Sequence, residues 1–178
     1  MISTAQLQAI CTHAGDRIAP FVQPLNDAMS LFVIMKPRRQ AAFLAQCAHE
    51  SGELRWMREL ATGDAYEPPS QKAADLGNTQ PGDGRLFKGG GLIQITGRSN
   101  FAACGKGIGV DLVGHPELIE MPRNACMASA WWWQTHGLNE LADSNAFGSI
   151  THRVNRGYNH LDERLGYWLL ALKAMGAL

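Results

Sequence analysis

The stretch that organises the chain is residues 37–52, Pro-Arg-Arg-Gln-Ala-Ala-Phe-Leu-Ala-Gln-Cys-Ala-His-Glu-Ser-Gly. Pro37 suits the first turn of a helix, and the residues that follow it are mostly strong helix formers. Phe43, Cys47 and Glu50 come at spacings of four and three, so they share one face of this helix. The sequence therefore predicts a helix whose apolar face ends in a glutamate.

A carboxylate in that place is poorly positioned for stability. It follows an apolar stripe and lies near the negative end of the helix dipole, and both surroundings favour its protonated form. A protonated glutamate at neutral pH is what a general acid requires. The alternative is a surface glutamate on a frayed last turn.

The composition fits one compact domain of 178 residues, of which 46% are hydrophobic. Lys+Arg and Asp+Glu both number 16, so the charge gives no sign of nucleic-acid binding. No apolar run is long enough to span a bilayer, and no stable membrane insertion is expected. The first residues lack the charged start and apolar segment of a signal peptide, which indicates synthesis in the cytoplasm.

Metal chemistry is not expected. The four cysteines form no Cys-x-x-Cys pair, and Cys47 and Cys126 lie in apolar helical patterns as packed thiols. His49 and Glu50 begin like the zinc motif His-Glu-x-x-His, but Glu53 stands where the second histidine belongs. We expect neither a metal nor a cofactor.

Most of the remaining chain also has helical spacing. Further helices are predicted from Ser3 to about residue 14, from Pro24 to Phe32, over 54–61, around 100–104, from Pro122 to a stop at Gly137, over 138–143 and 147–154, and from about Asn159 to Gly176. Sustained alternation is absent, so a mostly α fold is predicted, with at most a minor β element after the glycines at 89–91.

Residues 62–91 differ from the rest. They are rich in Gly, Pro, Asp and Ser and show little periodicity. A stretch this long inside a compact domain is usually functional, for example as a lid. We predict one catalytic domain over 1–178, with 62–91 a mobile lobe over a cleft.

Three consecutive tryptophans, Trp131 to Trp133, lie in the helix predicted from Pro122. They span about 200° of helix surface, so they cannot all face one seam. Two are expected in the core and one, with Trp133 as the candidate, in a groove that suits a sugar ring. Core packing of all three is the commoner alternative.

Several motifs follow one another along the chain: His-Glu-Ser-Gly at 49–52, Glu59, Leu-Gly-Asn-Thr-Gln-Pro-Gly-Asp-Gly at 76–84, Gly-Leu-Ile-Gln-Ile-Thr-Gly-Arg-Ser-Asn-Phe at 91–101, Asn-Arg-Gly at 155–157 and Asp-Glu-Arg-Leu-Gly-Tyr at 162–167. Together they resemble glycoside hydrolase family 19, which holds chitinases and phage lysozyme-like endolysins. The resemblance covers roughly residues 38–170. The 76–84 run and the short form resemble the endolysin branch more than the secreted plant chitinases.

This resemblance implies a bilobed, lysozyme-like helical fold and hydrolysis of β-1,4 links beside amino sugars. It implies Glu50 as general acid and Glu59 as the base that activates water, with Thr96 helping to hold that water. The substrate-binding candidates are His49, Gln94, Ser99, Asn100, Trp133, Asn155 and Arg164.

The spacing of the carboxylates gives a test. On one straight helix, Glu59 would lie about 13.5 Å along the axis from Glu50 and on the opposite side, so the chain must break at Gly52. An inverting pair needs about 6.5–9.5 Å between its carboxyl groups. Glu53 is the rival partner, because three residues along the same face would suit the shorter retaining distance of about 5–5.5 Å.

The sequence departs from the family pattern at two places, and both departures put the strength of catalysis in doubt. Gly90 stands where the family commonly has arginine, and Pro68-Pro69 replaces a Gly-Arg pair that endolysins often carry.

We expect an inverting endolysin, a monomer that cuts peptidoglycan strands in the periplasm after a holin lets it pass the inner membrane. The alternatives are a chitinase and a noncatalytic sugar-binding descendant.

Overall fold

The structure is a computed structural model that describes all 178 residues. It confirms the mostly α prediction, because the only β features are isolated bridges from Gly90 to Arg58 and to Ile95. Short 3-10 turns cover Gly15–Ile18, Asp64–Tyr66 and Pro116–Glu120. The helices are α1 (Thr4–Ile10), α2 (Ala19–Leu31), α3 (Pro37–Glu50), α4 (Gln71–Asp75), α5 (Asp83–Leu86), α6 (Arg98–Ile108), α7 (Pro122–Thr135), α8 (Leu138–Asp143), α9 (Phe147–Asn155) and α10 (Leu161–Ala174).

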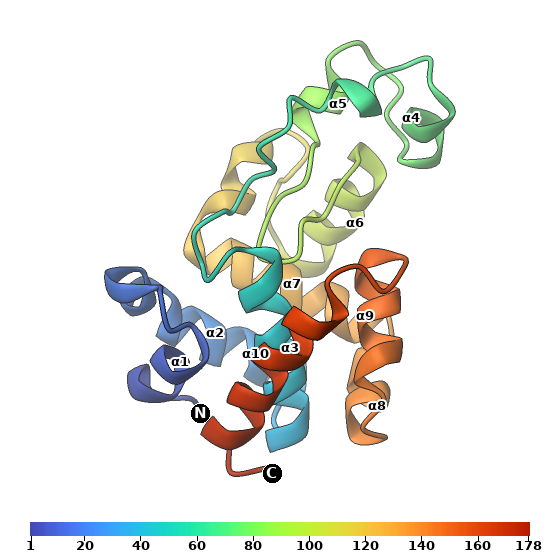
Figure 1. Cartoon of the computed structure of the whole chain (residues 1–178). Helices are drawn as coiled ribbons and strands as arrows, with labels where there is room; N and C mark the ends of the chain where they lie inside the picture. The colour runs from blue at the N-terminus through green and yellow to red at the C-terminus, as the bar shows by residue number, and fades with distance from the viewer.

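Helix α3 is the central element of the larger lobe, and α10 lies along it (Figure 1). Every residue from Gln40 to Ala48 is buried, so this helix is covered all round rather than on one stripe. The ring of Phe43 meets the edge of Trp133 on α7, with 5.4 Å between the ring centroids. The helix predicted from Pro37 is confirmed, and its burial fixes the position of Glu50 at its end.

Local signals at the helix ends were partly reliable. The predicted capping box of Ser3 and Gln6 is present at α1, which ends at Ile10 rather than near residue 14. The expectation that Pro24 opens a helix was wrong, because α2 already begins at Ala19 and Pro24 lies inside it. Pro24 is the sixth residue of α2, so the hydrogen bond that a residue there would donate to the carbonyl of Pro20 is missing from the helix.

The smaller lobe holds α4, α5 and α6, and it stands away from α1, α3 and α10 (Figure 1). The helix expected over 54–61 is absent, because this segment runs out to the lobe and Arg58 bridges to Gly90 instead. The helix expected around 100–104 is longer and forms α6. Asp83 is fully buried in this lobe and accepts hydrogen bonds from the N–H groups of Thr79 and Gln80.

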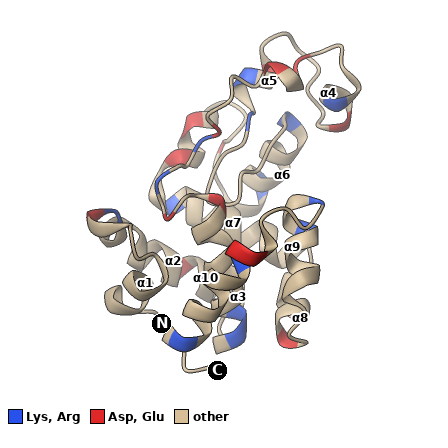
Figure 2. Cartoon of the chain, in the orientation of Figure 1, with Lys and Arg blue, Asp and Glu red and all other residues tan.

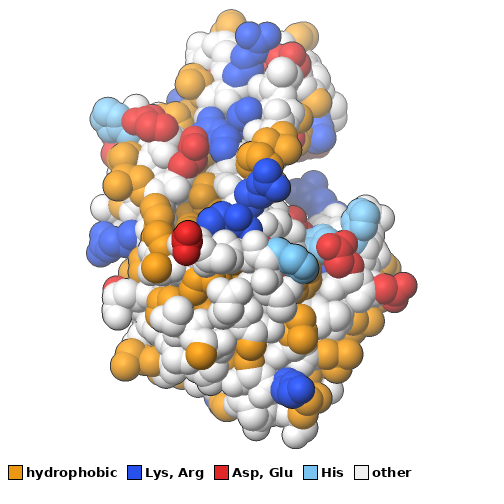
Figure 3. Space-filling view, turned by 60° about the vertical axis from the view of Figure 1, so that its left-hand side comes forward, with side chains coloured by type: hydrophobic (Ala, Val, Ile, Leu, Met, Phe, Trp, Pro, Cys, Tyr) orange, Lys and Arg blue, Asp and Glu red, His pale blue; other side chains and the backbone are white.

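Charged side chains mark the boundary between the lobes. Acidic residues lie at the start of α10, where Asp162 and Glu163 face the positive end of the helix dipole (Figure 2). A space-filling view shows a hollow between the lobes with Lys and Arg side chains along it (Figure 3). None of the helices is both long enough and apolar enough to cross a membrane.

Candidate active site

A cleft of about 400 Å³ lies between residues of the small lobe and helices α7 and α9. It brings together four residues that the sequence placed at the site: Gln94, Thr96, Asn100 and Asn155. The remaining lining residues are Tyr66, Lys72, Asp75, Leu76, Ile93, Ile95, Trp132, Arg153, Val154 and Arg156.

Glu50 is the last residue of α3, and its carboxylate meets a polar network instead of an apolar stripe. Arg164 of α10 donates to Glu50 Oε1 at 2.5 Å and to Gln46 Oε1 at 2.5 Å. Gln46 in turn donates to the hydroxyl of Thr151 at 2.9 Å. The expectation of apolar surroundings for Glu50 was therefore wrong, because residues from α9 and α10 supply polar partners that the local sequence does not reveal.

The helix break predicted at Gly52 is confirmed. Gly52, Glu53 and Leu54 have φ values of 57°, 56° and 64°, all in the left-handed region. Such a run cannot continue a right-handed helix, so the chain turns out of α3. The Ser51 hydroxyl fixes the turn, since it donates to the carbonyl of Cys47 at 2.6 Å and accepts from the Leu54 N–H at 2.8 Å.

Glu59 is held where the chain reaches the small lobe. Its Oε2 accepts from the Gly89 N–H at 3.0 Å, and its own N–H donates to the Gly89 carbonyl at 2.8 Å. The Tyr66 hydroxyl donates to Oε1 at 3.0 Å. Burial and this bond raise the pKa of Tyr66 to about 12, so the phenol stays protonated and keeps the carboxylate in one orientation.

Tyr66 was missed by the sequence analysis. It lines the cleft and contacts Glu59, yet it lies in the segment that composition marks as irregular. The signal that could have found it is an aromatic hydroxyl seven residues after a candidate base.

Glu53, the rival partner, is only 5% exposed and faces the α1 side of the molecule. Its carboxylate accepts from the His13 N–H at 2.5 Å and from the Tyr167 hydroxyl at 3.1 Å. Burial raises the pKa of Tyr167 above its ordinary value, which keeps this donor protonated. The carboxylate thus joins the segment that follows α1 to α10, which favours Glu59 as the partner of Glu50.

The segment from Gly91 to Thr96 forms one wall of the cleft. Gln94 has a φ of 58°, and its amide donates to the Gly91 carbonyl at 3.1 Å. The Thr96 hydroxyl donates to the Gln94 carbonyl at 3.0 Å, and Asn100 donates to the Thr96 carbonyl at 2.7 Å. These local bonds hold the three side chains in fixed positions along the wall.

Asn155 lies on the opposite wall, at the end of α9. Its amide nitrogen donates to the carbonyl of Asn159 at 3.1 Å, while its buried Oδ1 has no partner. A buried acceptor without a donor is costly, so this oxygen is suited to receive a ligand N–H or O–H.

Two other candidates lie behind or beside the cleft. Ser99 does not line it, and its hydroxyl is packed so closely on Gly77 that a Cβ there would lie 1.7 Å away. His49 packs near His160 and Tyr167, and its buried Nδ1 has no hydrogen bond but lies 3.7 Å from Oε2 of Glu163. Burial lowers the pKa of His49, so the ring is neutral at pH 7. Its place is beside Glu50 on α3 rather than on the cleft wall.

The tryptophans divide differently from the expectation. Trp133 is fully buried and donates to Asn139 Oδ1 at 3.1 Å, so its proposed contact with substrate was wrong. Trp132 lines the cleft instead, stacked on His136 with 3.9 Å between ring centroids. Trp131 packs on Gly107 of α6. The reason is the position of α3, whose Phe43 receives Trp133.

Gly90 has a packing reason to lack a side chain. It is buried between its two bridge partners, and a Cβ would lie 2.6 Å from Ile119 and 3.2 Å from Phe101. An arginine at this position would require Ile119 to move. Ile119 and Phe101 therefore occupy the space that a side chain at position 90 would need.

Comparison with known proteins decides the family. A family model described as Chitinase class I matches residues 33–156, more than half of the chain. The chain belongs to glycoside hydrolase family 19. A family 19 domain-containing protein of Haemophilus influenzae is 31% identical over 192 residues and covers 92% of each chain. An endochitinase of Arabidopsis thaliana is 35% identical, over 67% of this chain and 40% of its own length.

Solved structures show the same fold for this family 19 chain. Chitinase C from Streptomyces griseus superposes with a TM-score of 0.80 at 22% identity, covering 98% of this chain and 92% of the other. A class IV chitinase from Zea mays gives a TM-score of 0.75 at 20% identity, with 99% and 94% covered. The protein is a glycoside hydrolase of the chitinase type with the expected lysozyme-like helical fold.

Proposed function

We propose that this family 19 hydrolase cuts β-1,4 links between N-acetylated amino sugars, with chitin-type glycans as its substrates. The named plant relatives are endochitinases, which supports this choice over the endolysin expected from the sequence. The observation that carries the proposal is the fixed carboxylate of Glu59, held by Tyr66 and Gly89 beside a cleft that contains Gln94 and Thr96.

In this proposal Glu50 protonates the glycosidic oxygen, and Glu59 takes a proton from the water that attacks the anomeric carbon. Water attacks the face opposite the leaving group, so the anomeric configuration inverts. Arg164 then stabilises the carboxylate that remains on Glu50 after proton transfer. In this proposal Thr96 orients the water, while Asn100 and Asn155 bind the sugar amides and hydroxyls.

Peptidoglycan is the second candidate, and the charge of the cleft favours it. Three cationic residues line the cleft, Lys72, Arg153 and Arg156, against one acid, Asp75. Chitin is neutral, whereas the muramic acid units and stem peptides of peptidoglycan carry carboxylates that such a rim attracts. Lysis of a host wall, release through a holin and action in the periplasm would follow only if this candidate holds.

One experiment separates the two substrates. The protein and its Glu50→Gln variant are incubated with soluble chitin oligomers and with purified peptidoglycan, and the new reducing ends are identified. If the unchanged protein releases N-acetylglucosamine reducing ends from chitin oligomers and Glu50→Gln does not, the first candidate is supported. Muropeptides from peptidoglycan without chitin cleavage would establish the second, and no product from either polymer would leave a noncatalytic sugar-binding protein.

A further inference from the structure

A second face of the molecule, between α2 and α3, exposes apolar side chains. Leu31, Val33 and Met35 are 63%, 52% and 46% exposed, whereas Phe32 and Ile34 between them are 6% and 0% exposed. The two buried side chains anchor the connection in the core. The three exposed side chains alternate with these two along the chain.

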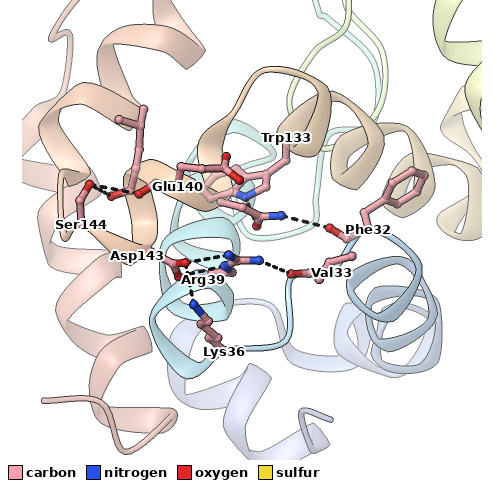
Figure 4. A network of polar contacts seen from close by, with 10 residues as sticks. Phe32, Val33, Lys36, Arg39, Trp133, Glu140, Asp143 and Ser144 are labelled. Carbon is pink, nitrogen blue, oxygen red and sulfur yellow. Dashed lines mark hydrogen bonds and ion pairs between the residues drawn. The ribbon is translucent and has the colours of Figure 1, made fainter.

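The backbone of this connection is held in an unusual shape. Val33 has a φ of 58°, a region that β-branched residues rarely adopt and that Gly or Asn would fill at lower cost. Arg39 donates to the Val33 carbonyl at 2.8 Å, and Asn139 donates to the Phe32 carbonyl at 3.2 Å (Figure 4). The fold thus retains an exposed valine where a polar residue would fit better, and fixes it from α3 and α8.

Positive charge follows directly after the apolar residues. Lys36 and Arg39 both bind the carboxylate of Asp143, each with a nitrogen 2.7 Å from Oδ2 (Figure 4). These two cations lower the pKa of Asp143 well below its usual range, so it remains ionised and paired. Arg38 is exposed and takes no part in this network. Three cations, Lys36, Arg38 and Arg39, therefore stand against the two carboxylates of Asp143 and Glu140, which leaves one positive charge in excess, and Arg38 is the cation outside the network.

A hollow of about 460 Å³ lies in the same face. It is lined by Lys36, Arg38 and Asp143 together with residues 176–178, and Leu178 is 79% exposed at its edge. A cationic hollow beside exposed apolar side chains is the arrangement that suits a phosphate headgroup next to its acyl chains.

We propose that this face, residues 31–38 with Leu178, docks on the surface of an anionic lipid bilayer. The apolar side chains would enter the boundary between headgroups and acyl chains, and the cations would contact lipid phosphates. A stable protein interface normally uses about 20–30 residues on each side, many more than this face offers. Shallow contact with lipid needs only a few such residues.

Docking would also orient the enzyme. Helix α3 begins in this face at Pro37 and ends at Glu50. Its 14 residues rise about 20 Å, so the docking face and the general acid lie at opposite ends of one rigid helix. The cleft would then point away from the bilayer, toward a polymer on the far side.

The test is cosedimentation with vesicles of phosphatidylglycerol and phosphatidylcholine, compared with phosphatidylcholine alone. We expect binding to the anionic vesicles to be at least about tenfold stronger and to weaken as salt is raised. Val33→Asn and Arg38→Gln should each weaken it about fivefold or more, since each removes one inserted or contacting group. Leu86→Asn, at an apolar position 48% exposed on the small lobe, should bind as the unchanged protein does.

Val33→Asn keeps this test free of a folding artefact, because Asn tolerates the left-handed conformation and should not lower the melting temperature. Equal binding to both vesicle types, or no loss in Val33→Asn and Arg38→Gln, would overturn the proposal. A dimer in light scattering that Val33→Asn dissolves would assign the face to a second copy instead. Cleavage of soluble oligomers should be the same in all three variants, so failure here leaves the proposed function untouched.

Discussion

The guanidinium of Arg164 lies 2.5 Å from the carboxylate of Glu50, across 114 positions of sequence. The same guanidinium also binds Gln46 and the carbonyl of Asn159. It is only 2% exposed, so these partners replace water almost completely. Helix α10 thereby completes the surroundings of the candidate acid.

We expect Arg164→Lys to be damaging even though charge is preserved. An ammonium group cannot reproduce the planar fork that reaches Glu50 and Gln46 together. Losing one partner of a buried pair typically costs about 3–5 kcal/mol. Denaturant unfolding should show a loss near the lower end, since a charge remains, and kcat should fall more than KM rises. Arg38→Lys, at an exposed site, is the matched control, and equal behaviour of the two variants would contradict the role given to Arg164.

The carboxylates should separate by their effects. Glu50→Gln and Glu59→Gln should each lower kcat by about 10²–10⁴, because each loses its proton-transfer role. Glu50→Gln should also lower the free energy of unfolding, because it leaves the buried Arg164 without its charged partner. Glu53→Gln should keep most of the activity but lower the free energy of unfolding, since its carboxylate holds His13 and Tyr167. Activity assays with chitin oligomers and denaturant unfolding measure both quantities.

The stereochemistry gives an independent reading of the same pair. NMR of the fresh product should show the α-anomer first, as inversion requires. A β-anomer, together with an inactive Glu53→Gln and an active Glu59→Gln, would transfer the mechanism to Glu50 and Glu53.

The neighbouring tryptophans provide another test. Trp133→Ala should destabilise the protein by about 3–5 kcal/mol, because it opens a cavity beside Phe43. Trp132→Ala should mainly raise KM, because its ring lines the cleft. Trp131→Ala is the control for both variants, because this ring packs on Gly107 of α6 and does not line the cleft. Equal losses of stability in all three, with KM unchanged, would remove the binding role of Trp132.

The small lobe should be sensitive to acid. Arg98 holds the pKa of Asp83 at about 2, below its ordinary value of 3.8. A depressed pKa stabilises the folded state above about pH 4, and this contribution of about 2 kcal/mol is lost as pH falls toward 2. Thermal unfolding between pH 5 and pH 2 should show the loss, and Asp83→Asn should be less stable at pH 5 with a flatter profile. If the stability of Asp83→Asn fell with pH as steeply as that of the unchanged protein, the role given to Asp83 would be contradicted.

Residues 62–91 are still predicted to move over the cleft. They contain only short helices, and many of their backbone groups lie near solvent. Hydrogen exchange should be faster there than in α7 and should slow when a chitin oligomer binds. Exchange as slow as in α7, with and without the oligomer, would show a rigid lobe.

Sequence reasoning succeeded where the deciding interaction is local. Helix α3 begins at Pro37, and the chain leaves it at Gly52, through backbone geometry that a few neighbouring residues determine. It failed where partners come from distant helices. The polar network at Glu50 depends on Arg164, and the choice between Trp132 and Trp133 depends on where Phe43 packs. Tyr66 reaches Glu59 because of the path that the chain takes through the small lobe, and composition does not reveal that path.

The pairing of Arg164 with Glu50 also has a consequence for synthesis. Glu50 leaves the ribosome 114 residues before its partner, so a growing chain carries both candidate carboxylates long before α10 exists to dock on α3. Contacts of such sequence separation form late in folding. The nascent enzyme should therefore stay inactive until α10 has been synthesised, and a chain terminated before Leu161 should not acquire hydrolase activity.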